Sequence, residues 1–175
     1  MDTWKEFEAN ELTHSAAHHL LAIDDVGAAY GGWARVSDIA RRLNITRGSV
    51  SINLRTLKTR GWVETDQHRL VKLSPRGLTV VQSVKAKRVI VKRFLRDVLG
   101  IPEAEAEIDS CKIEHLISHA TGARLVQFVR FLTCGAPASR QLLKQFRTLQ
   151  TACPADHRCE VCNGQCLIDE LKRAI

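Results

Sequence analysis

The sequence predicts a mainly α-helical protein with one small β-hairpin. Three observations predict this class. Apolar residues recur at helical spacing through most of the 175 residues, one pair of short β-prone runs interrupts them, and positive charge gathers in one segment. Residues 33–98 contain sixteen Lys and Arg against four Asp and Glu, whereas the whole chain carries +7. Such a cationic segment favours a polyanionic partner.

Helices are expected on both sides of a tight turn in the first sixty residues. Ser37 is expected to be the N-cap of a short helix, and Thr46 the N-cap of a longer one that stops at Gly61. The glycine-rich stretch VGAAYGG ends the first helix. The expected helices before the hairpin cover residues 12–25, 37–42 and 46–60.

The hairpin is expected in WVETDQHRLVKLS, with its polar turn at residues 66–68. Pro75 then opens a long helix, because proline fits the first turn of a helix. The stretch IPEAEAEIDS is expected to be a connector with at most one helical turn. The later helices are expected over residues 75–100, 109–118, 121–132 and 139–151, with a short amphipathic tail over residues 167–175.

A short helix, a tight turn, a second helix and a hairpin follow one another as in a winged helix-turn-helix unit, whose second helix enters the DNA major groove. The alternatives are a solvated basic face, a winged helix that contacts protein, and non-specific RNA binding, for which aromatic platforms are scarce. The candidate DNA-contacting residues are Ser37, Thr46, Arg47, Gly48, Ser49, Ser51, Asn53, Arg55, Lys58 and Arg69.

A second motif, CKIEH, places Cys111, Glu114 and His115 on one helical face. A thiolate, a carboxylate and an imidazole on one face could converge on a metal ion. A packed cysteine beside a surface glutamate is the alternative.

From about residue 12 to residue 132 the chain resembles the DtxR/MntR family of metal-dependent bacterial repressors. The resemblance is carried by ARVSDIARRL, TRGSVSINLRTLKTRGWV, LSPRG, FLRDVLGI and CKIEHLIS. It implies a homodimer that binds a palindromic operator of double-stranded DNA. It also implies that the helices after the winged helix hold regulatory Fe(II) or Mn(II).

The resemblance implies a residual ion site at His18, Cys111, Glu114 and His115, with His19 as the alternative to His18. At two positions where the family has metal ligands on the long helix, this chain has Arg88 and Lys92. These cations cannot ligate a metal at neutral pH. We expect them instead to pair with Glu107 or Glu114 and to supply the positive charge of an ion.

The four cysteines Cys153, Cys159, Cys162 and Cys166 lie within fourteen residues. This spacing favours one iron–sulfur cluster, such as 4Fe-4S, or one Zn(II), because both are held by four thiolates. Two disulfides and four free thiols remain alternatives. Cys134 stands apart and is expected to be a buried thiol.

The sequence therefore predicts a winged helix-turn-helix domain (residues 1–74), a helical dimerisation and metal-sensing region (75–151) and a four-cysteine tail (152–175). The expected function is that of a transcriptional regulator that responds to iron, iron–sulfur or redox status through the tail. The alternatives are a Mn(II)- or Fe(II)-activated repressor with structural zinc in the tail, and a redox adaptor. No catalytic constellation, signal peptide or membrane span is expected, which favours a cytoplasmic protein.

Overall fold

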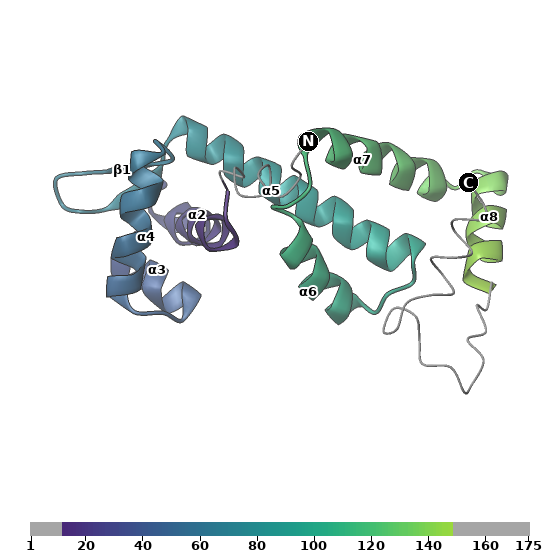
Figure 1. The fold of residues 1–175 in the computed structure, drawn as a ribbon, viewed down its shortest axis with the longest axis horizontal. Helices are drawn as coiled ribbons and strands as arrows, with labels where there is room; N and C mark the ends of the chain where they lie inside the picture. The colour runs from purple at the N-terminus through teal and green to yellow at the C-terminus, as the bar shows by residue number, and fades with distance from the viewer. Residues whose placement is uncertain (1–11, 149–175) are drawn as a thin grey trace, which may run out of the picture.

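The computed structural model describes residues 12–148, which form two halves joined by one long helix, α5 (Figure 1). The mainly helical architecture confirms the predicted fold class for this part of the chain. The elements in chain order are α2 (His14–Gly27), η1 (Ala28–Tyr30), α3 (Val36–Leu43), α4 (Arg47–Thr59), β1 (Val63–Thr65), β2 (Val71–Leu73), α5 (Pro75–Arg93), η2 (Phe94–Val98), α6 (Glu103–Ile113), α7 (His119–Thr133) and α8 (Pro137–Thr148).

The first half is a winged helix-turn-helix unit built around one hydrophobic core. Helices α2, α3 and α4 and the hairpin each send an apolar face into this core, where Leu20, Ile39 and Trp62 are almost fully buried. An isolated bridge pairs Ala34 with Val71, so the segment before α3 adds to the edge of the hairpin. The predicted order of elements in this half is confirmed.

The turn between α3 and α4 is short because Asn44 adopts a left-handed conformation, with φ of 53°. Thr46 then caps α4, as predicted, by accepting a hydrogen bond from the Ser49 amide. The prediction for α3 was wrong in one detail. This helix begins at Val36, so Ser37 lies inside it and its hydroxyl donates to Asp38 instead of capping.

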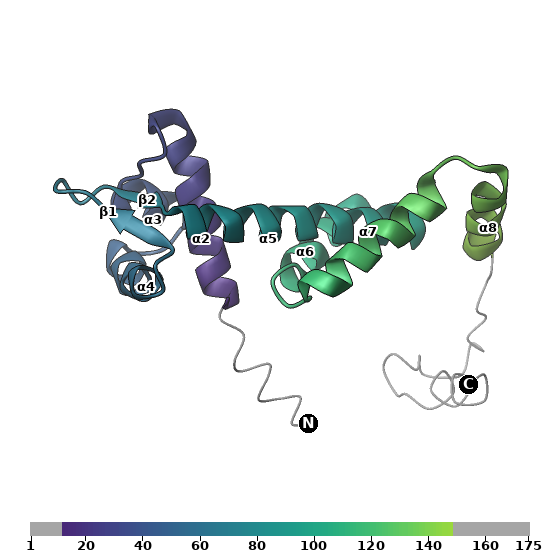
Figure 2. The same ribbon diagram turned by 90° about the horizontal axis from the view of Figure 1, so that it is seen from above.

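The hairpin pairs β1 and β2 antiparallel, with Val63 opposite Leu73. At its turn, the Asp66 carboxylate accepts hydrogen bonds from the amides of His68 and Leu70, at 2.9 and 2.7 Å. The turn predicted at residues 66–68 is therefore confirmed. Figure 2 shows this wing extending beyond α4 at one end of the molecule.

Helix α5 starts at Pro75, as predicted, behind the N-cap Ser74. A Cβ on Gly77 would lie 2.0 Å from the Trp62 carbonyl oxygen, so only glycine lets α5 pass this close to the hairpin. A π-helical turn, η2, continues α5 to Val98. Within residues 12–148, no helix is both long enough and apolar enough to cross a membrane.

In the second half, α6 and α7 pack along the C-terminal part of α5 (Figures 1 and 2). A small core there is centred on Ile90, Val98, Val129 and Leu132. The expected connector before residue 109 was wrong. Helix α6 begins at Glu103 and ends at Ile113.

Candidate nucleic-acid interface and candidate metal centre

Helix α4 presents one face to the core and the opposite face to solvent. Val50 and Leu57 are buried in the core and fix the inner face. Five of the predicted DNA-contacting residues on α4 are exposed: Arg47, Gly48, Ser51, Arg55 and Lys58. Within residues 12–148, the side chains of Arg47, Arg55 and Lys58 form no hydrogen bond or ion pair. These cations therefore extend from α4 ready to meet an anion.

Several polar side chains of α4 are already engaged inside the protein. The hydroxyl groups of Thr46 and Ser49 lie 2.9 Å apart, and the Ser51 hydroxyl donates to the Arg47 carbonyl at 2.9 Å. The Asn53 amide is used at both ends: it accepts from the Ser15 hydroxyl at 3.1 Å and donates to the Ser49 carbonyl at 3.1 Å. Asn53 thus holds α4 against α2.

The two remaining predicted DNA-contacting residues lie away from α4. Ser37 is half-buried on α3. Arg69 is exposed at the tip of the wing, where it has a positive φ of 62°. Lys72, on β2, lies 3.4 Å from Glu64 and 4.8 Å from the centre of the Trp33 ring, so its charge is partly used within the hairpin.

Other cations of the basic segment are paired with acidic residues at the end of α2. Arg42 on α3 donates to Asp25 at 2.9 Å, and Lys85 donates to Asp24 at 2.7 Å, which joins α5 to the first half. The side-chain hydrogen bond with Asp24 raises the pKa of Lys85. The excess positive charge of residues 33–98 is therefore divided between exposed cations on α4 and paired cations on α3 and α5.

A second group of polar residues lies where α2 meets α6. The Cys111 thiol is 3.3 Å from His18 Nε2. The His14 ring centre lies 4.3 Å from that of His18 and 4.9 Å from that of His115. His19 is directed elsewhere, with its Nδ1 on the Ser15 carbonyl at 2.7 Å. Of the two histidines left open by the sequence, the structure therefore brings His18 to Cys111.

Glu114 is fully buried beside this group, and neither of its carboxylate oxygens has a hydrogen-bond partner within residues 12–148. Burial raises the pKa of Glu114 to about 7, and it also raises the pKa of the Cys111 thiol. Burial lowers the pKa of His18, with His14 and Arg88 as further causes. A buried carboxylate without hydrogen bonds is costly, so a cation beside it would be stabilising.

The side chains of this group do not yet converge on one point. In the part of the chain that the structure describes, no three His, Cys, Asp or Glu side chains are placed to hold an ion as they stand. A cavity of about 330 Å³ lies beside them, between α2, α3 and α5. His18, Arg88 and Glu114 contribute to its wall. The imidazole, thiol and carboxylate groups are therefore chemically suitable ligands for a divalent ion, and their side chains would need to rotate to bind it.

The positions of Arg88 and Lys92 explain what the neighbouring part of the domain does instead. Arg88 pairs with Glu107 and lies 3.8 Å from Glu114, whereas Lys92 lies 2.5 Å from Glu103 and 2.8 Å from Glu107. The predicted pairing of both cations is confirmed, and Glu103 is an additional partner. Among the described residues, no ligand set for an ion remains at this place.

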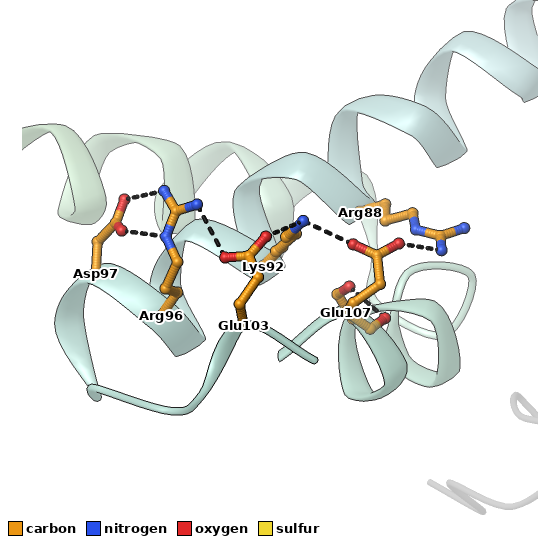
Figure 3. A network of polar contacts seen from close by, with 7 residues as sticks. Arg88, Lys92, Arg96, Asp97, Glu103 and Glu107 are labelled. Atoms are coloured by element: carbon orange, nitrogen blue, oxygen red, sulfur yellow. Dashed lines mark hydrogen bonds and ion pairs between the residues drawn. The ribbon is translucent and has the colours of Figure 1, made fainter. Parts of the chain in front are cut away.

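Figure 3 shows that these contacts continue into a ladder of alternating charges between α5, η2 and α6. Arg96 extends it, at 3.1 Å from Glu103 and 2.6 Å from Asp97. The hydrogen bonds from Lys92 hold the pKa of Glu103 and of Glu107 below the usual range. We refer to Arg88, Lys92, Arg96, Asp97, Glu103 and Glu107 as the charge ladder.

The four clustered cysteines lie outside the described residues, as does the predicted boundary between residues 151 and 152. Cys134 lies within them, at the end of α7, and the expectation that it is buried was wrong. Its side chain is exposed, and the hydrogen bond with Ser139 lowers the pKa of its thiol.

Two protein-family models match the chain, one over each half. A model described as the iron dependent repressor, metal binding and dimerisation domain matches residues 74–137. A MarR family model matches residues 11–69. The boundary between the matches falls at the start of α5, where the winged unit ends.

Curated relatives agree with this division. The iron-dependent repressor IdeR of Mycobacterium tuberculosis is 28% identical over 118 residues, which cover 67% of this chain and 51% of IdeR. The transcriptional regulator MntR of Lysinibacillus sphaericus is 29% identical over 101 residues, covering 58% of this chain and 72% of MntR. The chain therefore spans about half the length of IdeR.

The fold also matches a solved structure. The crystal structure of IdeR from T. acidophilum superposes with a TM-score of 0.53 at 25% identity, over 66% of this chain and 53% of that one.

Proposed function

Because the chain belongs to the DtxR/IdeR/MntR family of metal-dependent repressors, which are not enzymes, we propose that it represses transcription by binding operator DNA in a metal-dependent way. The observation that carries this proposal is the outward face of α4, where Arg47, Arg55 and Lys58 extend without partners among the described residues. A helix of this kind beside a wing fits the major groove of a duplex, and its cations fit the phosphates.

In this proposal, the protein acts as a homodimer on a palindromic operator. The second half of the chain matches a domain described as one for metal binding and dimerisation. Two α4 helices of a symmetric pair reach two half-sites one helical turn apart. The same proposal includes the division of the chain into domains after residues 74 and 151. It also places the protein in the cytoplasm.

The metal dependence is assigned to one divalent ion, Fe(II) or Mn(II), at the junction of α2 and α6. His18, Cys111, Glu114 and His115 would hold it. Bound there, the ion would coordinate the buried Glu114 carboxylate, whose oxygens have no hydrogen-bond partner among the described residues and face one cation, Arg88, at 3.8 Å. Since His18 belongs to the DNA-binding half and the other three to the second half, these residues would fasten α2 to α6 and thereby fix the direction of α4.

The charge ladder limits this proposal to a single ion. Arg88 and Lys92 already neutralise Glu107 and join α5 to α6. A second cation placed there would meet two fixed positive charges. The charge ladder would therefore hold α6 against α5 both with and without bound metal.

The iron–sulfur cluster predicted for Cys153, Cys159, Cys162 and Cys166 remains a prediction, because these residues lie outside the described ones. The family supports regulation by a divalent ion, and in the alternative reading that goes with it the tail would hold structural Zn(II). Metal analysis and an absorption spectrum of protein purified without oxygen separate the two readings. Visible thiolate-to-iron bands favour the cluster, and stoichiometric zinc without them favours the structural site.

The experiment that tests DNA binding is a selection from random duplexes with the full-length protein, followed by affinity measurements at several salt concentrations. If α4 and the wing lie on the phosphates, the logarithm of the affinity falls steeply as salt rises. An affinity that hardly changes with salt would favour the redox adaptor instead.

A further inference from the structure

An isoleucine occupies the middle of the outward face of α4. The Ile52 side chain is 65% exposed, whereas Val50 and Leu57 on the opposite side of the helix are buried. Because successive residues of a helix are 100° apart, Ile52 points almost directly away from these two. It is the apolar side chain that the helix would present first to a partner lying on this face.

The surroundings of Ile52 do not form an apolar surface. Its neighbours one turn away along the same face are Gly48, Arg55 and Thr56, all of them exposed. A protein partner that docked on an apolar patch would need more than one exposed aliphatic side chain here. On α4 itself Ile52 is the one large apolar side chain that is exposed, since Ile45, at 38%, lies in the turn before the helix. One aliphatic side chain among cations and small residues instead fits a partner that is anionic and offers isolated methyl groups.

Gly48 adds an independent observation. A Cβ on Gly48 would meet only the Thr46 hydroxyl oxygen, at 3.7 Å, which is ordinary van der Waals contact, and the backbone φ is not in the left-handed region. The fold therefore does not need a glycine here, although glycine within a helix destabilises it relative to alanine. A glycine that packing does not require, on the outward face, is suited to close approach by a partner's surface.

Duplex DNA supplies both features. In the major groove, each thymine presents a C5-methyl group that apolar side chains contact. The amide of Asn53, a usual reader of adenine, is used on Ser15 and Ser49. This leaves Arg47 and Arg55 for guanines or phosphates and Ile52 for a methyl group.

We propose that Ile52 contacts a thymine C5-methyl group in each half-site of the operator, and that the missing side chain at Gly48 lets the first turn of α4 come close enough for this contact. This inference rests on the proposed DNA binding and adds to it a residue that determines specificity. It predicts a thymine near the centre of each α4 footprint.

The test replaces thymines by deoxyuridine, which lacks only the 5-methyl group. The full-length protein is used with Mn(II) on a duplex selected from a random pool, and each thymine is exchanged in turn while the dissociation constant is measured by fluorescence anisotropy. Wild-type protein is expected to lose about fourfold in affinity at one position of each half-site, the loss for one methyl group that is no longer buried. In Ile52→Ala the same exchange changes nothing further.

Leu78→Ala is the matched control, because Leu78 is also exposed, at 43%, and lies on α5. This variant retains the sensitivity to deoxyuridine. The inference would be overturned if deoxyuridine cost wild type and Ile52→Ala the same affinity, or if it cost wild type no affinity at any thymine. Sequence-selective binding to DNA would in either case leave the proposed function in place. Failure to bind DNA in a salt-dependent way would overturn both.

Discussion

The Arg88 guanidinium lies 3.8 Å from the buried carboxylate of Glu114. This ion pair brings a positive charge to a carboxylate that has no hydrogen-bond partner within residues 12–148. The same guanidinium also pairs with the more exposed Glu107. Arg88 is therefore both a member of the charge ladder and a neighbour of the predicted ion site beside α2.

Arg88→Met tests this connection, because it keeps the length of the side chain and removes its charge. We expect the free energy of unfolding to fall by about 1–3 kcal/mol, since Glu107 and the buried Glu114 lose a cation. Urea denaturation followed by circular dichroism measures the change. Arg93→Met is the control: Arg93 is exposed and lies 3.5 Å from Asp97, so its loss should cost less. Equal costs would contradict a special role for Arg88.

Cys111→Ser is expected to weaken the binding of Fe(II) and Mn(II) at least tenfold, because a hydroxyl is a poorer ligand than a thiolate. Isothermal titration of the metal into full-length protein under nitrogen measures the affinity directly. Cys134→Ser, which alters an exposed thiol at the end of α7, serves as the control and should bind the ion as wild type does. Unchanged affinity in Cys111→Ser would remove this residue from the site.

Arg47→Ala should weaken operator binding to a similar degree for all DNA sequences and should reduce the slope of log affinity against log salt by about 1 for each subunit. The reason is that an exposed guanidinium at the start of α4, which has no partner within residues 12–148, fits a phosphate. Arg124→Ala removes an exposed arginine on α7 that donates to Gln127 and should leave the slope unchanged. A loss of affinity without a change of slope would show that Arg47 does not contact phosphate.

Gly48 and Gly77 lie in the first turns of α4 and α5, and replacing them by alanine is expected to have opposite effects on stability. Gly77→Ala should destabilise the protein by about 1–3 kcal/mol, because its Cβ would collide with the Trp62 carbonyl. Gly48→Ala should leave stability unchanged or raise it by about 0.5–1 kcal/mol, while it weakens operator binding. Thermal denaturation and anisotropy measure the two effects. Destabilisation by Gly48→Ala would show that the fold itself requires this glycine.

The charge ladder makes stability depend on pH in the acidic range. The pKa values of Glu103 and Glu107 are lowered, first by the hydrogen bonds from Lys92. A carboxylate whose folded pKa lies below its unfolded value of about 4.3 stabilises the fold above that pH, and the contribution is lost as the pH falls through the folded pKa. The melting temperatures of wild type and Lys92→Met should therefore differ at pH 7 and converge as the pH falls through the lowered pKa values of these two carboxyl groups. A constant difference would exclude ionisation as its cause.

The sequence predicts the winged half well because its signals are local. Thr46 caps α4, Gly61 follows its end with a positive φ, and the polar turn at residues 66–68 joins two short strands. Each feature depends on residues within a few positions of one another. The pairing of Arg88 and Lys92 with α6 was also predicted, since their charges are incompatible with ligation.

Helix α6 was predicted poorly because its stability comes from distant contacts. The stretch PEAEAEIDS has no apolar period, so it reads as a connector. In the fold, Ala106 is completely buried, and Glu103 and Glu107 form ion pairs with Lys92 on α5. Sequence reasoning also missed His14, although its spacing of four residues from His18 places both on one helical face.

The residue type of Ile52 does not predict its exposure, because an isoleucine on a helix is usually assigned to a core. The helical spacing of Val50, Leu54 and Leu57 predicts which side of α4 faces the core, and the burial of Val50 and Leu57 confirms it. The structure adds that Ile52 is not covered by another element among the described residues and is available to a partner.

The measurement that tests the central claim most directly is the affinity of the full-length protein for its selected operator duplex, with and without a divalent ion, under nitrogen. The account predicts that Fe(II) or Mn(II) tightens binding at least tenfold, that a chelator reverses the effect, and that Glu114→Gln abolishes it. The same affinity in the presence and absence of both ions, with Glu114→Gln indistinguishable from wild type, would contradict it.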